Sequence, residues 1–172
     1  MQLINDNMNQ MYKVAKSRLL SDEDVGDAIQ ETILAAYKNL DKLKEVRYFK
    51  TWLIRILINK CNDIVSKSKN IIYIEDYSLI NNGMSMKTNN ESIEDRLDFI
   101  KTLEVLSEDY RTVVVLYYVN GFTTKEISEI LGEKEGTIKS RLNRARQRLK
   151  DYYLEINDDK SLIGYKIGGD TL

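Results

Sequence analysis

The sequence predicts an all-α protein built as two small helical domains joined by a flexible linker. Three observations support this prediction. Proline is absent from all 172 residues, apolar residues recur mostly at steps of three and four, and a helix-turn-helix pattern lies toward the C-terminus. A stretch with Asn-Asn-Gly and no sustained period indicates the linker. We therefore expect domains at 1–68 and 93–154, a linker at 69–92 and an acidic tail at 155–172.

The first domain is expected to hold three helices. Amphipathic spacing predicts the first at about 11–19. Ser21 is the predicted N-cap of the second, because three carboxylates follow it where they favour the positive end of a helix. The charged segment 41–47 is expected to be a loop, and a third helix follows at about 48–67. The apolar positions of the second helix are Val25, Ile29, Ile33, Ala36 and Tyr37.

In the second domain, a helical block is expected from Ser92 to Leu103, and the segment after it is ambiguous. Residues 113–119 have strong strand propensity. We predict a helix there, because the apolar residues continue a helical stripe and no partner strand is present. Ser107 before the segment and Gly121 after it are typical helix start and stop signals.

The net charge of −1 conceals strongly charged segments. Residues 136–150 hold six basic side chains and no acidic one, and 41–69 are also mainly basic. By contrast, 21–31 hold five acidic side chains and no basic one. This distribution suggests a polyanion bound at two places and a basic partner bound at a third. Solvated helix faces are the alternative explanation.

The composition excludes several classes of chemistry. Cys61 is the only cysteine and histidine is absent, so an internal disulfide, thiolate zinc clusters, histidine-ligated metals and Ser-His-Asp triads are excluded. No Gly-rich phosphate loop is present. We therefore expect no enzyme activity, no cofactor and no small-molecule substrate. The longest apolar run is far shorter than the ~20 residues of a membrane span, and residues 1–10 lack a signal peptide's basic cluster, so the expected location is cytoplasmic.

The segment from Thr123 to Lys150 matches a helix-turn-helix in several independent ways. Thr123 and Glu126 are placed as the two ends of a capping box. Ser128 is small enough for two helices to approach each other, and Gly132 supplies the tight turn between them. Ile138, on the second helix, is placed to fill the space between the two.

The second helix of this motif separates its side chains by chemistry. Its apolar residues fall on one narrow stripe, and basic and amide residues occupy the other faces near the helix N-terminus. This is the arrangement that major-groove reading requires. An ordinary helical hairpin with a solvated basic face is the alternative. The candidate DNA-binding residues are Lys139, Ser140, Arg141, Asn143, Arg144, Arg146 and Arg148.

Several segments resemble one family, the extracytoplasmic-function (ECF) sigma factors of bacterial RNA polymerase. Residues 106–116, followed by 121–127, resemble region four of that family, and 136–142 are similar to the start of its recognition helix. Residues 27–32 resemble the region-two helix that docks on polymerase. Residues 48–63 resemble the helix that opens the promoter. These segments occur in the family's order, with a linker between them.

The resemblance implies roles for particular residues. The candidates listed above for DNA binding would read the −35 element. The segment 41–47 and the helix after it would bind the non-template strand of the −10 element. Phe49 and Trp52 are expected in the core because they lie on the apolar stripe, with base stacking as the alternative. Residues implied at the −10 element are Arg47, Tyr48, Lys50, Arg55 and Asn59. Residues implied in polymerase binding are Asp27, Gln30 and Glu31.

The implied function is that of an alternative sigma factor. Its partners would be promoter DNA, core RNA polymerase at the β′ clamp helices and β flap, and an anti-sigma factor, which in this family is often membrane-bound. Two alternatives remain open: a stand-alone helix-turn-helix regulator, and a sigma-like interaction protein that starts no transcripts. For the acidic tail, a solvated end and a mask for the basic helix or a regulator site are both open.

Overall fold

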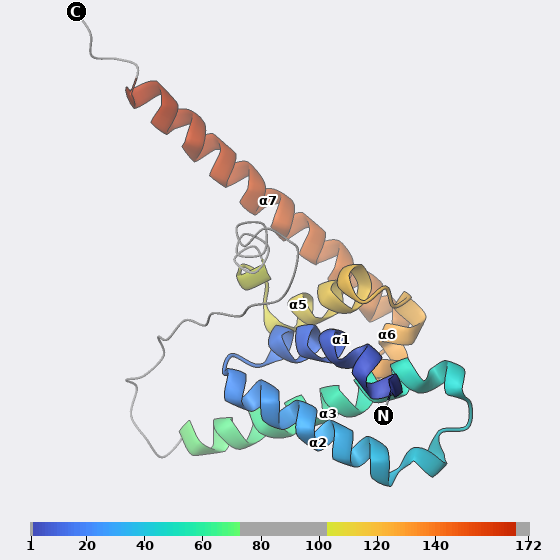
Figure 1. Ribbon diagram of the computed structural model, residues 1–172. Helices are drawn as coiled ribbons and strands as arrows, with labels where there is room; N and C mark the ends of the chain where they lie inside the picture. Colours follow the sequence, from blue (N-terminus) through green and yellow to red (C-terminus); the bar gives the residue numbers. More distant parts are fainter. Residues whose placement is uncertain (1, 73–102, 168–172) are drawn as a thin grey trace, which may run out of the picture.

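The computed structural model describes residues 2–72 and 103–167, with side chains described for 2–67 and 103–155. All regular elements in these ranges are helical, which confirms the predicted fold class. Figure 1 shows the first three long helices packed together, with the C-terminal helices against them and one helix extending outward. No described helix is long and apolar enough to cross a membrane.

The N-terminal half consists of three helices around a small core. They are α1 (Gln2–Arg18), α2 (Asp22–Lys38) and α3 (Phe49–Ile72), with 3-10 turns η1 (Leu40–Lys42) and η2 (Val46–Tyr48) between the last two. The predicted cap is confirmed, because the Ser21 hydroxyl accepts a hydrogen bond from the amide of Asp24. Met11, Val14, Leu53 and Leu57 are fully buried between these helices.

Three details of this half differ from the sequence predictions. Helix α1 begins at Gln2, well before residue 11, and the predicted loop 41–47 contains two 3-10 turns. Helix α3 continues to Ile72, into the predicted linker. Residues 73–102, which include most of that linker and the predicted helical block from Ser92, lie outside the described residues.

Tyr37 was assigned to the apolar stripe of the second helix, and this assignment is wrong. Its side chain is 81% exposed, whereas Ala36 is buried. Successive residues on a helix are rotated by about 100°. With Ala36 facing the core, Tyr37 therefore points to solvent near the end of α2.

The C-terminal half contains α5 (Glu108–Val114), the π-helical turn η3 (Val115–Val119), α6 (Thr124–Leu131) and α7 (Glu135–Ile167). The helix predicted over 113–119 is therefore confirmed. Ser107 occupies the N-cap position of α5, although its hydroxyl makes no cap hydrogen bond. Gly121 follows η3 with φ of 71°, in the left-handed region that glycine adopts readily.

Helix α7 extends past the predicted domain end and into the predicted tail. Its 33 residues form one helix from Glu135 to Ile167, and Figure 1 shows it reaching well beyond the other helices. No glycine lies between Gly136 and Gly164, and the chain has no proline. Because these are the residues that interrupt helices most strongly, nothing in that interval stops the helix.

The two halves pack against each other. Helix α1 contacts α5 and η3, and α3 contacts α6. The buried apolar residues of both halves form one continuous cluster. These contacts join the two halves into one packed unit.

Candidate nucleic-acid interface

The helix-turn-helix is fixed by a complete capping box and a glycine turn. The Thr123 hydroxyl accepts a hydrogen bond from the Glu126 amide at 3.2 Å, and a Glu126 carboxylate oxygen accepts one from the Thr123 amide at 2.8 Å. Gly132 ends α6 with φ of 69°. Ile138 is fully buried. These contacts set the orientation of α7 relative to α6.

One face of α7 is open to solvent. Ser140, Asn143 and Arg144 are exposed, and the described residues provide no hydrogen-bond or ionic partner for them. Lys139 is also exposed and pairs with Glu135 at 2.9 Å, one helical turn earlier. A hydroxyl, an amide and a guanidinium therefore stand together near the start of a rigid helix, where they can donate to base edges.

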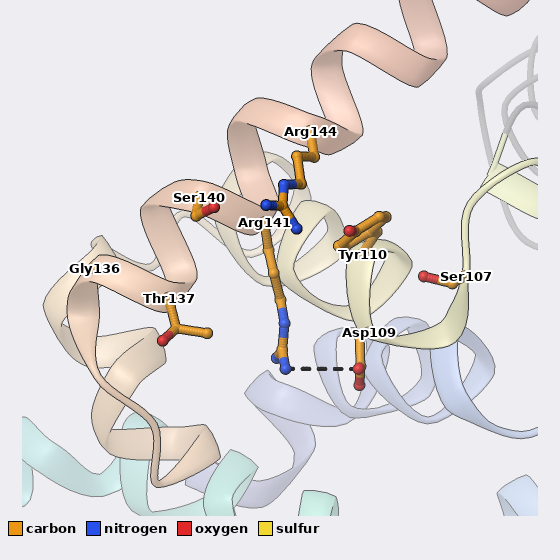
Figure 2. Close-up of a pocket in the computed structure, with 8 residues that line it drawn as sticks. All are labelled: Ser107, Asp109, Tyr110, Gly136, Thr137, Ser140, Arg141 and Arg144. Atoms are coloured by element: carbon orange, nitrogen blue, oxygen red, sulfur yellow. Dashed lines mark ion pairs between the residues drawn. The ribbon is translucent and has the colours of Figure 1, made fainter.

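Arg141 lies on a flank of this face and is held by the protein. Its guanidinium is 2.7 Å from Glu133 in the turn and 3.5 Å from Asp109 on α5, and its side chain is 21% exposed. Figure 2 shows Arg141 and Arg144 projecting from α7 toward the start of α5, where Asp109 and Tyr110 lie. An open groove of about 460 Å³ runs along these residues.

Two further arginines of α7 contact tyrosines. Arg146 donates from Nε to the Tyr118 hydroxyl at 2.7 Å, and the Arg148 guanidinium lies 5.2 Å from the centre of the Tyr110 ring. These contacts tie α7 to α5 and η3. The sequence offered no signal for these contacts, because the tyrosines lie 28 and 38 positions before the arginines and no local pattern pairs them. Contact of Arg141, Arg146 and Arg148 with DNA stays a prediction.

The residues predicted at the −10 element lie on η2 and α3. Tyr48 is 51% exposed, and the Arg47 guanidinium lies 4.9 Å from its ring centre. Arg47 also pairs with Glu45 at 2.7 Å. Arg55 and Asn59 are exposed one helical turn apart.

The two aromatic residues of this segment differ. Phe49 is buried and belongs to the core, whereas Trp52 is half-buried and packs against it. Their ring centres are 6.0 Å apart. The core interpretation is therefore confirmed for Phe49.

Lys50 is already engaged with the other half of the chain. Its ammonium donates to the Asn120 carbonyl at 2.7 Å and lies 4.6 Å from the centre of the Phe122 ring. Sequence analysis gave no indication of this contact, since the residues are 70 positions apart.

The residues predicted to bind polymerase lie together on α2. Asp27, Gln30 and Glu31 are all exposed. Glu31 pairs with Lys60 of α3 at 3.0 Å, and this pairing lowers the pKa of the Glu31 carboxyl. Leu34 and Tyr37 are exposed further along the same face, so apolar surface lies next to the acidic side chains.

Two family models match the chain. Sigma-70 region 2 matches residues 3–71, and Sigma-70, region 4 matches residues 96–149. The ECF RNA polymerase sigma factor SigW of Bacillus subtilis (strain 168) is 30% identical over 155 residues, covering 83% of this chain and 82% of that protein. The ECF RNA polymerase sigma-E factor of Escherichia coli (strain K12) is 32% identical over 151 residues, covering 80% of this chain and 79% of that protein.

Two solved structures are similar across both halves. The sigma factor RpoE from Bartonella quintana, in complex with the anti-sigma factor NepR, is 29% identical with a TM-score of 0.78, covering 87% of this chain and 93% of that chain. CnrH, in complex with the cytosolic domain of CnrY, is 26% identical with a TM-score of 0.62, covering 88% and 85%. Because both sigma-70 regions match in order and identity to ECF relatives extends over about four-fifths of the chain, this protein belongs to the ECF family of RNA polymerase sigma factors.

Proposed function

We propose that this ECF sigma factor binds core RNA polymerase and directs it to a specific set of promoters. The observation that carries the proposal is the open face of α7. Ser140, Asn143 and Arg144 stand there without protein partners among the described residues, in a chain that contains both sigma-70 regions. The chain acts by binding, and the polymerase carries out the chemistry of RNA synthesis. Because bacterial RNA polymerase works in the cytoplasm, the chain acts there too.

In this proposal, α7 reads the −35 element in the major groove. Arg144 suits bidentate bonding to guanine, and Asn143 suits the same geometry with adenine. Lys139 and Ser140 lie beside them at the start of the helix. Arg141, Arg146 and Arg148 lie on the flanks, where arginines meet phosphates, and their protein partners hold them in place.

The η2–α3 segment captures the opened −10 element. The exposed Tyr48 ring offers a stacking surface for an unpaired base, and Arg47, Lys50 and Arg55 supply positive charge for the strand backbone. Asn59 lies on the same exposed side and adds an amide for a base edge.

Polymerase docking uses the exposed face of α2. Asp27 and Glu31 are complementary to basic clamp helices of the β′ subunit, and Gln30 lies between them. Leu34 and Tyr37 add apolar area to this surface. The C-terminal half meets the β flap. An anti-sigma factor that covers these faces would keep the chain from polymerase, as the complexes of the two structural neighbours suggest.

The test is co-purification with bacterial core polymerase, followed by transcription from a pool of genomic fragments. Stable binding with discrete new start sites is expected. Binding without transcripts would favour a sigma-like interaction protein. DNA binding by the free chain without polymerase binding would favour a stand-alone regulator.

Glu31→Ala tests the docking surface directly. Loss of the carboxylate removes one charge opposite a basic partner, so the affinity of the chain for core polymerase should fall roughly fivefold. Because this step precedes promoter choice, the loss should be the same for every promoter. Glu23→Ala, an exposed carboxylate in the first turn of α2, is the matched control and should bind as the parent does. Unchanged affinity of Glu31→Ala would show that the docking surface lies elsewhere.

A further inference from the structure

The turn of the helix-turn-helix carries two carboxylates that reach basic side chains of α7. Glu133 and Glu135 lie between the end of α6 and the first turn of α7. Glu135 pairs with Lys139 at 2.9 Å. Glu133 pairs with Arg141 at 2.7 Å, and Asp109 of α5 adds a second carboxylate to that arginine at 3.5 Å (Figure 2). Two cations of the proposed DNA-binding set are therefore already paired with carboxylates in the free chain.

Hydrogen bonds of the turn hold both carboxylates in these positions. The amide of Glu133 donates to the Ser128 carbonyl at 3.0 Å. The Thr124 hydroxyl donates to a Glu135 carboxylate oxygen at 2.7 Å, so Glu135 connects the start of α6 with the first turn of α7. The hydrogen bonds from Thr124 and Lys139 lower the pKa of the Glu135 carboxyl. This carboxyl is therefore ionised at neutral pH.

The other side chains of the α7 surface have no carboxylate partner among the residues with described side chains. Ser140, Asn143 and Arg144 have neither a hydrogen-bond nor an ionic partner there. Arg146 contacts a tyrosine hydroxyl, and Arg148 contacts a tyrosine ring. The turn thus offsets positive charge at two positions beside the reading face and leaves the guanidinium of Arg144 unpaired.

Pairing with a carboxylate offsets the charge of a cation but leaves some of its hydrogen-bond donors. A guanidinium has five N–H donors and an ammonium has three. Arg141, whose Nη1 and Nη2 face carboxylates, and Lys139 can therefore still donate to a phosphate oxygen at close range. Binding to DNA of arbitrary sequence depends on net charge through the release of counterions, whereas a cognate site adds direct contacts with the bases. A paired cation therefore contributes less to arbitrary DNA than to a cognate site.

We propose that Glu133 and Glu135 are specificity-determining residues, which offset the charge of Arg141 and Lys139 and so weaken binding to arbitrary DNA more than binding to the cognate −35 element. The proposal rests on the proposed function for the identity of the cognate site. Its electrostatic part concerns only the free chain and duplex DNA. Weak binding to arbitrary DNA matters for promoter choice, because a genome offers about 10⁶–10⁹ competing non-cognate sites.

The first test measures the affinity of the free full-length chain for a duplex of random sequence, by fluorescence anisotropy at several salt concentrations. Glu133→Gln and Glu135→Gln each remove one charge and keep the size and a hydrogen-bond acceptor. Each variant should bind the random duplex roughly three- to tenfold more tightly, with a slope of log K against log salt that is steeper by about 0.9. Glu129→Gln, at an exposed position of α6, is the matched control and should change the affinity by less than about twofold.

The second test measures discrimination on a duplex that carries the −35 element of a promoter found in the genomic pool. The affinity of Glu135→Gln for this duplex should rise by less than about twofold, so its preference over the random duplex should fall roughly threefold or more. Transcription from the genomic pool by polymerase carrying this variant should then begin at additional sites that the parent chain does not use. An equal rise in affinity for the two duplexes would overturn the role in specificity.

The remaining outcomes separate this proposal from the proposed function. Weaker binding of Glu133→Gln to both duplexes would mean that Glu133 serves only to aim Arg141, and the proposal would fail. Random-duplex affinities of both variants equal to that of Glu129→Gln would also overturn it. Tighter random-duplex binding by the two variants of a chain that does not bind core polymerase would support the electrostatic part and count against the proposed function.

Discussion

The two surfaces assigned to DNA differ in how ready they are to bind it. On α7, Ser140, Asn143 and Arg144 are exposed and without protein partners among the described residues. On η2 and α3, Arg47 is paired with Glu45, and Lys50 is held by the second half. Ser140, Asn143 and Arg144 can meet a duplex as they stand, whereas Arg47 and Lys50 must first exchange their own contacts. The α7 surface thus suits a closed duplex contacted from outside, and the η2–α3 surface suits a single strand that is exposed only after the promoter opens.

The largest effect is expected from removing the packing that presents the α7 face. Ile138 is fully buried between α6 and α7, so Ile138→Ala should lower the free energy of unfolding by about 2–5 kcal/mol. Urea denaturation followed by circular dichroism measures the change. Val105→Ala, at a partly exposed position, should change stability by less than about 0.5 kcal/mol. Similar losses in both variants would mean that α7 is not fixed by this contact.

Next in size is the loss of the α7 guanidinium itself. Arg144→Ala should weaken binding to the cognate promoter by about 1–3 kcal/mol and so reduce transcription from it roughly 5- to 150-fold. The affinity for polymerase should be unchanged. Lys150→Ala, on the same helix but further from its N-terminus, should weaken all promoters slightly and equally. An effect of Arg144→Ala that is equal at every promoter would reassign this residue to a phosphate.

The core beneath α3 contains the only cysteine of the chain, Cys61. The titration of this buried thiol makes the stability of that core depend on pH. Burial raises the pKa of Cys61 to about 12 from an ordinary 9.0. Below pH 9 both folded and unfolded states keep the proton; between about 9 and 12 only the folded state does. Stability should therefore fall with rising pH, by up to about 1.4 kcal/mol per unit. Urea unfolding at pH 8 to 11 should show a shallower fall for Cys61→Ala, and parallel slopes would contradict this assignment.

The smallest effect is expected where Arg47 is released from its own ion pair. Glu45→Gln removes a partner that is exposed to solvent, and such pairs contribute at most about 1 kcal/mol. Promoter opening, measured by permanganate reactivity of the −10 strand, should change by no more than about fivefold. Glu45→Asp keeps the charge and serves as control. A loss of tenfold or more would show that the Arg47–Glu45 pair is part of the bound geometry.

Local signals predicted much of this structure, and contacts distant in sequence were beyond them. The caps at Ser21 and Thr123 and the helix over 113–119 depend on neighbouring residues, so sequence analysis found them. Tyr37 was misplaced because three- and four-residue steps fit two adjacent helix positions equally well. The extent of α7 was missed because a polar composition was taken as the sign of a tail.

The candidate site divides in the same way. The open face of α7 follows from helical geometry alone, and the structure agrees with the projection. The partners of Lys50, Arg141 and Arg146 depend on how separate helices pack. Their roles in DNA binding stay predictions.

The length of α7 amplifies small changes in its orientation. Its 33 residues span about 50 Å, whereas the major groove is only about 8.5 Å deep. If its first turns lie in the groove, as proposed, most of the helix must stand clear of the duplex. A tilt of 10° at the DNA end would move the far end by about 9 Å over that length. Small differences in how the first turns sit on one promoter or another are thus magnified into large displacements at the distal end.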